Sequence, residues 1–300
     1  MWTSSTGYLI LELGGDPMQS SRGYTDLLGR LVRDPKGAVG LGVILCFTIL
    51  PFLRPLITKY PPLAVGVGVP NEPPSHLHPM GTTSLGQDVF SQFLAGGLVP
   101  VEVGVLTGIF TSLLVVLIAI PAGYYSQRLG RLLTLITDVF LIIPTLPLII
   151  LIGVYLGPSL INQVLVLTLI SWPFPARVVA SQVLSLKERG FVQGAKALGA
   201  SDARIMFGEI LPNVTNLIIS NSILVIIFAI LFQTAISFLG LGVPTAPGWG
   251  NMLYYAEQSG AIASGEWWWV VPPGLGILAV AFGFSLLFLR LEELLGVEVR

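Results

Sequence analysis

Charged side chains in this sequence are separated by long apolar stretches that match the length of membrane-spanning helices. A helix needs about 20 mostly apolar residues to cross a bilayer, and the gaps between charges predict six of them. These lie at residues 37–58, between Glu102 and Arg128, in two passes between Leu132 and Ala176 that Gly157-Pro158-Ser159 separates, near Asn216–Phe238, and between Glu266 and Arg290. Pro144 and Pro147 in the third helix, and Pro173 and Pro175 in the fourth, predict kinks in those two passes.

The composition agrees with a membrane protein. Charged residues make up 10% of the chain, against about 25% in soluble domains, while 53% is hydrophobic and the mean hydropathy is +0.83. Fifteen basic and sixteen acidic side chains could not cover the surface of a soluble protein of 300 residues. We therefore predict an all-α integral membrane protein embedded in a lipid bilayer. A net charge of −1 and the lack of a basic run exclude nucleic acid as a partner.

Basic residues predict the orientation, because Lys and Arg concentrate on the cytoplasmic side of membrane proteins. If the N-terminus is cytoplasmic, all 15 basic residues except Arg54 and Lys59 lie inside, and the C-terminus is cytoplasmic as well. The chain then divides into a cytoplasmic segment at 1–36, a first transmembrane helix at 37–58, an extracytoplasmic loop at 59–97, and a five-helix core at 98–295 with a cytoplasmic loop at 177–213.

The long cytoplasmic loop contains a short amphipathic helix. Its apolar stripe consists of Phe191, Val192, Ala195 and Leu198, at helical spacing. Gly199 can break the helix, and Pro212 is expected to end the loop where the fifth membrane helix starts. Small residues beside the stripe would let the helix seat closely in a groove of another protein. The alternative is a linker that lies on the membrane surface.

The same segment resembles the cytoplasmic coupling motif of ABC-importer permeases, a Glu-Ala-Ala followed by Gly and, further on, Leu-Pro. Gln193 stands in place of the acidic residue and Gly194 in place of the first alanine. The resemblance implies contact with an ATP-binding subunit through Phe191, Val192, Gln193, Gly194, Ala195, Leu198, Gly199, Leu211 and Pro212. The lost charge at Gln193 leaves open any ion pair that the family glutamate makes with that subunit.

Two further motifs resemble the dipeptide and oligopeptide branch of these permeases. GTTSLGQD at 81–88 is similar to its GTDxxGRD signature, with Thr83 and Gln87 replacing Asp and Arg, and SFLGLGVPTAPGWG at 237–250 is similar to its FLGLG…WG segment. The resemblance covers residues 30–295. It implies the type I importer permease fold in a prokaryotic cell membrane, a second homologous permease, two ATP-binding subunits and an extracytoplasmic substrate-binding protein. Di- or oligopeptides are the expected substrates, with oligosaccharides or nickel as alternatives.

The chain carries no GxxxxGK(S/T) loop, so it is not expected to bind ATP by that route. We predict a transport subunit that is no enzyme and holds no cofactor, with ATP and Mg²⁺ bound by partner subunits. A stand-alone secondary carrier is the rival interpretation. Such carriers place ionisable groups within the membrane, and here Asp138 is the one acid clearly inside a predicted span. It could pair with Arg128 or Arg131, cap the local backbone, or line a translocation path.

Aromatic and histidine residues of the outer loops receive simple interpretations. The Trp267–Trp269 run, where the sixth helix enters the membrane, is typical of an interfacial aromatic belt, with docking of a binding protein as the alternative. His76 and His78 have no nearby cysteine and only one close acid, so they form a poor metal site and are expected to be ordinary loop residues.

Overall fold

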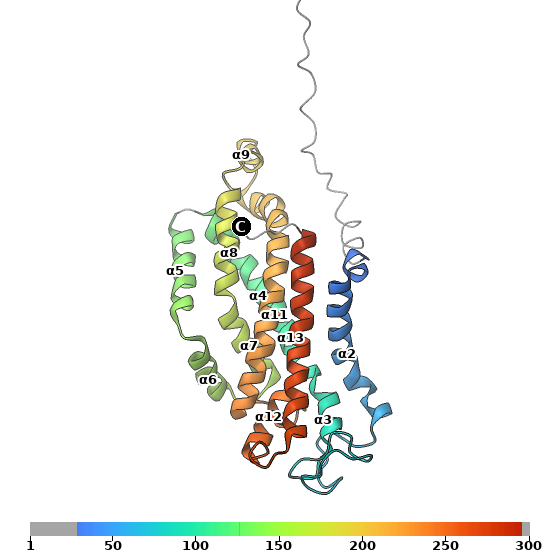
Figure 1. Ribbon diagram of the computed structural model, residues 1–300. Coiled ribbons are helices and arrows are strands. Elements are labelled where there is room, and N and C mark those ends of the chain that lie inside the picture. Colours follow the sequence, from blue (N-terminus) through green and yellow to red (C-terminus); the bar gives the residue numbers. More distant parts are fainter. Residues whose placement is uncertain (1–28, 126, 296–300) are drawn as a thin grey trace, which may run out of the picture.

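The computed structural model describes residues 29–125 and 127–295, and all regular structure in this part of the chain is helical. Residues 1–28 of the predicted cytoplasmic segment lie outside the described residues. Figure 1 shows the long helices aligned side by side in one bundle, with α9 (Gly190–Ala197) at one end and α3 (Val89–Gly96) and α12 (Trp249–Gln258) at the other.

Six membrane passes, as predicted, account for the bundle. Four continuous helical runs are long and apolar enough to span a membrane, and two bent helix pairs each make one further pass. The passes are α2 (Pro35–Ile57), α4 (Leu98–Tyr124), α5 (Arg128–Ile142) with α6 (Thr145–Leu156), α7 (Leu160–Ser171) with α8 (Pro173–Leu186), α11 (Leu211–Ile236) and α13 (Trp267–Leu295). Two π-helical segments, η2 (Ile205–Ile210) and η3 (Ser237–Leu241), flank α11, and the short α10 (Asp202–Arg204) precedes η2.

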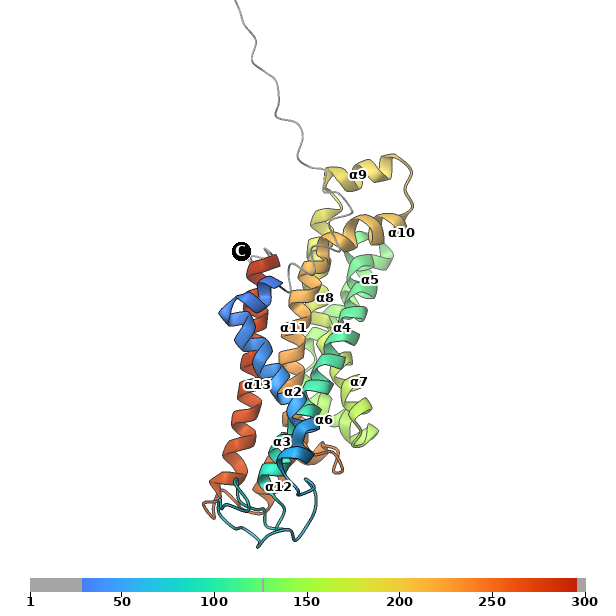
Figure 2. The ribbon, with the colours of Figure 1, turned by 90° about the vertical axis from the view of Figure 1, so that its right-hand side faces the viewer.

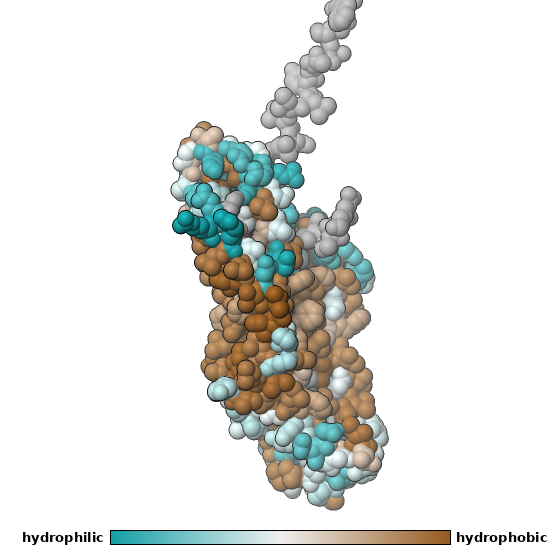
Figure 3. All heavy atoms as spheres, turned by 90° about the vertical axis from the view of Figure 1, so that its left-hand side faces the viewer, coloured by the Kyte–Doolittle hydropathy of each residue, from teal (hydrophilic) through white to brown (hydrophobic). Residues whose placement is uncertain are grey.

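The start of α2 and the end of α13 lie at the same end of the bundle as α9 (Figures 1 and 2). An even number of passes requires this arrangement, and the basic residues predict that this end is cytoplasmic. Figure 3 shows a broad hydrophobic band between more hydrophilic surfaces at the two ends. The band has the character of a lipid-facing surface.

One predicted helix boundary is wrong. Glu102 was expected ahead of the second membrane helix, but α4 begins at Leu98, so the exposed Glu102 side chain lies inside its second turn. Pro212 lies in the first turn of α11, as predicted, but it does not interrupt the chain's helical structure, which runs continuously from Asp202 through η2 into α11. The Leu211 N–H reaches back five residues to the Met206 carbonyl, and this wider turn accommodates the Pro212 ring without a break.

Glycine lets α4 pack closely against its neighbours at the centre of the bundle. A Cβ at Gly104 or Gly108 would lie 2.6 and 2.5 Å from side-chain atoms of α11, and a Cβ at Gly123 would lie 2.5 Å from the Ala180 carbonyl of α8. Small residues allow membrane helices to approach in this way. On the other side of the bundle α13 packs against α2.

Candidate functional site

Helix α9 lies across the cytoplasmic end of the bundle (Figure 2). Gly199 ends it with φ +82°, a conformation that glycine adopts without strain. The Gly199 N–H donates to the Lys196 carbonyl at 3.0 Å and the Ala200 N–H to the Ala195 carbonyl at 3.1 Å. These two bonds form a Schellman motif, which satisfies the last carbonyls of the helix. The predicted break at Gly199 is confirmed.

The predicted single apolar face of α9 is wrong, because its residues divide between two sides. Val192 is 2% exposed and packs with Ala195 on a core formed by α4, α8, η2 and α11. Phe191 and Leu198 are 43% and 90% exposed. Residues seven apart share one side of a helix, so Phe191 and Leu198 point away from the bundle. A Cβ on the exposed Gly194 would meet no atom within 4 Å.

Leu211 and Pro212 do not lie on this exposed side. They begin α11, where Leu211 packs against the same core as Val192. Gln193 instead stabilises the approach to α9, since its Nε2 donates to the Lys187 carbonyl at 2.8 Å. A glutamate carboxylate could not donate this bond. The amide at this position therefore has a role within the chain.

A polar cleft of about 610 Å³ separates α9 from the end of α4. Tyr124 Oη donates to Asp202 Oδ1 at 2.7 Å across it, which joins α4 to α10. Burial, together with the neighbouring Asp202 carboxylate, raises the pKa of Tyr125. The hydrogen bond between Tyr124 and Asp202 was not predicted, because no sequence pattern pairs residues that are 78 positions apart.

The predicted kinks in the third and fourth passes are confirmed. The axes of α5 and α6 differ by 90° across Ile143-Pro144, and those of α7 and α8 differ by 42° at Trp172. The Phe140 ring lies 5.4 Å from the Trp172 ring, so the two breaks meet. Both breaks fall near the middle of their passes.

Asp138 does not pair with Arg128 or Arg131. Its Oδ1 lies 3.2 Å from Arg177 Nη1 of α8. Arg131 is seven residues earlier on the same helix, about 10 Å along the axis, whereas Arg177 faces Asp138 from the adjacent pass. The pair therefore links the cytoplasmic halves of the two bent passes.

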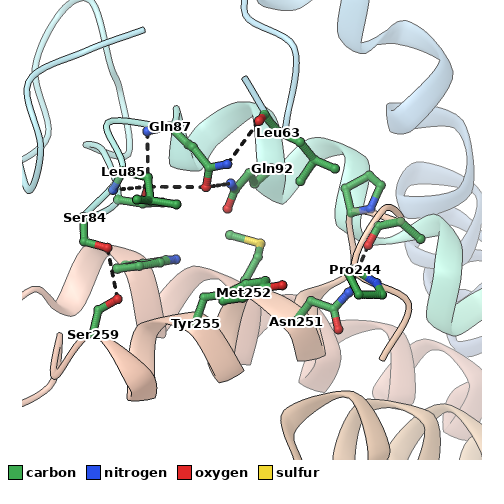
Figure 4. Close-up of a pocket in the computed structure, with 15 residues that line it drawn as sticks. Leu63, Ser84, Leu85, Gln87, Gln92, Pro244, Asn251, Met252, Tyr255 and Ser259 are labelled. Atoms are coloured by element: carbon green, nitrogen blue, oxygen red, sulfur yellow. Dashed lines mark hydrogen bonds between the residues drawn. The ribbon is translucent and has the colours of Figure 1, made fainter. Parts of the chain in front are cut away.

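An uncharged pocket of about 350 Å³ lies at the opposite end, between the 81–88 loop and α12 (Figure 4). Gln87 Oε1 accepts hydrogen bonds from Gln92 Nε2 at 2.9 Å and Thr83 Oγ1 at 3.4 Å. Gln87 Nε2 donates to the Leu63 carbonyl at 3.1 Å. Thr83 and Gln87, the two departures from the signature, thus contact each other and replace two charged residues by a neutral network.

His78 is not an ordinary loop residue. Its Nδ1 lies 2.8 Å from Asp88 Oδ1, with side-chain exposures of 3% and 1%, and its ring stacks on Tyr60. Asp88 Oδ2 also accepts the Ser91 N–H and thereby caps α3. His76 is exposed. Among residues 29–125 and 127–295, no three His, Cys, Asp or Glu side chains gather to hold a metal ion.

The three tryptophans differ in their surroundings. Trp267 is 59% exposed, Trp268 Nε1 donates to the Thr82 carbonyl at 3.3 Å, and Trp269 is 2% exposed. Trp267 alone of the three fits an aromatic belt or a docking contact, because the other two pack inside the extracytoplasmic end.

A family model described as the binding-protein-dependent transport system inner membrane component matches residues 115–296, more than half of the chain. The chain belongs to this family. Its fold is that of the type I ABC-importer permeases, and it is a component of a binding-protein-dependent transport system in the inner membrane.

Curated permeases resemble the chain over most of its length. A dipeptide transport system permease protein DppC of Alkalihalophilus pseudofirmus is 32% identical over 88% of this chain and 86% of its own. The DppC of Bacillus subtilis is 31% identical over 93% of this chain and 88% of its own. A putative peptide transport system permease of Brucella abortus is 32% identical over 97% of this chain and 96% of its own.

The family model covers some of the structural features described above and leaves others out. Residues 115–296 include both bent passes, α9 and α11, whereas the His78–Asp88 pair precedes the matched region. The curated relatives match more of the chain than the family model does, and the similarity to them reaches into the extracytoplasmic loop. The Gln87 side of the neutral pocket therefore precedes the region that the family model describes, whereas the α12 side lies within it.

Proposed function

We propose that this permease forms, with a second homologous permease, the pathway through which an ATP-driven importer moves di- or oligopeptides. Its relatives are named as dipeptide or peptide permeases, which favours peptides over oligosaccharides or nickel. An extracytoplasmic binding protein delivers the substrate, and two ATP-binding subunits hold ATP and Mg²⁺. This chain contributes neither a cofactor nor the hydrolytic site.

The exposed side of α9 carries the proposal. Phe191 and Leu198 present apolar surface on α9, which lies at the outermost cytoplasmic end of the bundle (Figure 2). Between them Gly194 leaves open space. An amphipathic helix with this profile fits a hydrophobic groove, and we assign that groove to an ATP-binding subunit.

The opposite side of α9 couples this contact to the membrane passes. α9 packs against η2, and Val192 belongs to a buried cluster that also contains residues of α4, α8 and α11; Tyr124 ties α4 to the start of α10. ATP binding closes the two partner subunits, and their movement displaces α9 together with these helices. The free energy of ATP binding thereby biases an equilibrium between outward-facing and inward-facing states.

Gly194→Leu tests the contact without disturbing the fold, because a Cβ there meets open space. Gly199 is less suitable, because its φ is +82° and a substitution there would strain α9 itself. The matched control is Gly42→Leu, another helical glycine in α2 with nothing within 4 Å. The complete transporter is reconstituted in liposomes, and peptide uptake and peptide-stimulated ATPase activity are measured. We expect Gly194→Leu to lose both and Gly42→Leu to retain both. Normal uptake by Gly194→Leu would overturn the assigned role of α9.

A further inference from the structure

A cavity of about 200 Å³ lies where the two bent passes break. Its wall contains residues of α5, α6, α7, α8 and α11, including Phe140, Ser171, Phe174, Asn221, Phe228 and Phe232. No charged side chain lines it. It has room for several water molecules or for one residue of a peptide.

Proline removes two α-helical hydrogen bonds beside this cavity. Phe140 and Ser171 line it, and Pro144 and Pro175 stand four residues after them. Because proline has no N–H, neither carbonyl can receive the usual hydrogen bond of an α-helix. The two residues belong to different passes, and the two breaks bring both of them to the wall of one cavity.

Asn221 adds a side-chain acceptor from α11. The residue is 9% exposed, and its Nδ2 donates to the Leu217 carbonyl of its own helix at 2.8 Å. That bond uses one of the two amide hydrogens, and the side-chain oxygen of this cavity-lining residue can accept a hydrogen bond from a molecule in the cavity. Three residues that can offer an oxygen acceptor thus line the cavity together with four phenylalanines.

The opening of the cavity cannot face lipid at low cost. Phe174 and Phe228 on its wall are 62% and 55% exposed, so the space is open to one side. Non-helical backbone at membrane depth is tolerated where it is buried in protein or lines a water-filled space. The open side therefore faces the pathway or the second permease.

We propose that this cavity is an intramembrane binding site for the N–H groups of a peptide, namely backbone amides and the terminal ammonium group. The proposal rests on the proposed function and adds where the substrate is held. The acceptors match N–H donors, and aromatic faces attract a cation. The wall has no cationic side chain for a carboxylate, so the C-terminus of the peptide lies outside this cavity.

Substitutions of Asn221 test the site in the reconstituted transporter. Asn221→Leu keeps the size of the side chain but removes the acceptor, and it should lower peptide uptake about tenfold, the effect of one buried hydrogen bond. Asn221→Asp keeps an acceptor and should retain uptake, with a shift towards lysine-containing dipeptides. The control is Thr234→Val in the same helix, whose hydroxyl bonds the Ile230 carbonyl and does not line the cavity. It should transport normally.

A dipeptide carrying a diazirine analogue of leucine locates the site directly. After irradiation during turnover, mass spectrometry should find labels on residues 140–145, 170–175 and 221–232, and Asn221→Leu should reduce them. Labels elsewhere on this chain with efficient uptake, or full uptake by Asn221→Leu, would overturn the proposed site and leave the proposed function intact. If the unmodified transporter imports no peptide but does import another solute, the proposed function fails instead.

Discussion

Replacing His78 by alanine is expected to loosen the extracytoplasmic loop that precedes α3. In His78→Ala, the Asp88 carboxylate loses a partner 2.8 Å away and keeps the Ser91 N–H. Leaving a buried polar group without its hydrogen-bond partner costs about 1–3 kcal/mol, and the lost stacking on Tyr60 adds about 1 kcal/mol. Since 1.4 kcal/mol is a factor of ten, local opening of the loop should become at least about 20-fold more frequent.

Amide hydrogen exchange measures this opening. The Thr82 N–H bonds the Glu72 carbonyl and the Val89 N–H bonds the Gly81 carbonyl, so peptides covering 72–91 report on the loop. His76→Ala is the matched control, because it removes an exposed imidazole two residues away. Equal exchange of the two variants across 82–91 would show that the buried pair does not hold the loop.

Three further outcomes follow from packing, charge and burial. Gly123→Val should lower the melting temperature in detergent far more than Gly42→Val. A Cβ at Gly123 would lie 2.5 Å from a backbone oxygen of α8, whereas a Cβ at Gly42 would meet no atom within 4 Å. Equal melting temperatures of the two variants would contradict the close packing. Asp138→Asn should lower the melting temperature by several degrees, because Arg177 then loses the carboxylate 3.2 Å away inside a membrane pass, where an unpaired charge is costly. Burial raises the pKa of Glu266 above its usual value. The folded state therefore loses stability as pH rises through the pKa of the buried carboxyl. Glu266→Gln should remove this loss, so that the melting temperature changes less with pH.

The membrane passes and their bends were predictable because both depend on local sequence. Six apolar stretches separate the charges, and the two breaks fall beside Pro144 and Pro173. Proline alone is not sufficient for a break, because Pro121 and Pro272 lie inside the continuous helices α4 and α13. The error at Glu102 has a simple origin. A charge was taken as a helix end, whereas α4 extends beyond the hydrophobic band and carries Glu102 on an exposed turn.

The contacts within the sites depend on tertiary packing and could not be predicted. Asp138 and Arg177 are 39 positions apart, and only the packing of two bent passes brings them together. Which side of α9 faces the bundle follows from the position of η2 against Val192. The helical periodicity of the sequence identified the apolar residues of α9, but it did not show that they divide between the buried and the exposed side of the helix.

The right-angle bend between α5 and α6 also fixes how far that pass can reach. At 1.5 Å per residue the two helices are about 22 and 18 Å long, so at a 90° bend their outer ends are separated by about 29 Å, without the two residues that join them. A hydrocarbon core is about 30 Å thick. The bent pass therefore just matches the bilayer, whereas a straight one would exceed it by about 10 Å. Its bend angle is thus coupled to bilayer thickness, and lipids with longer acyl chains favour a straighter α5–α6 pass.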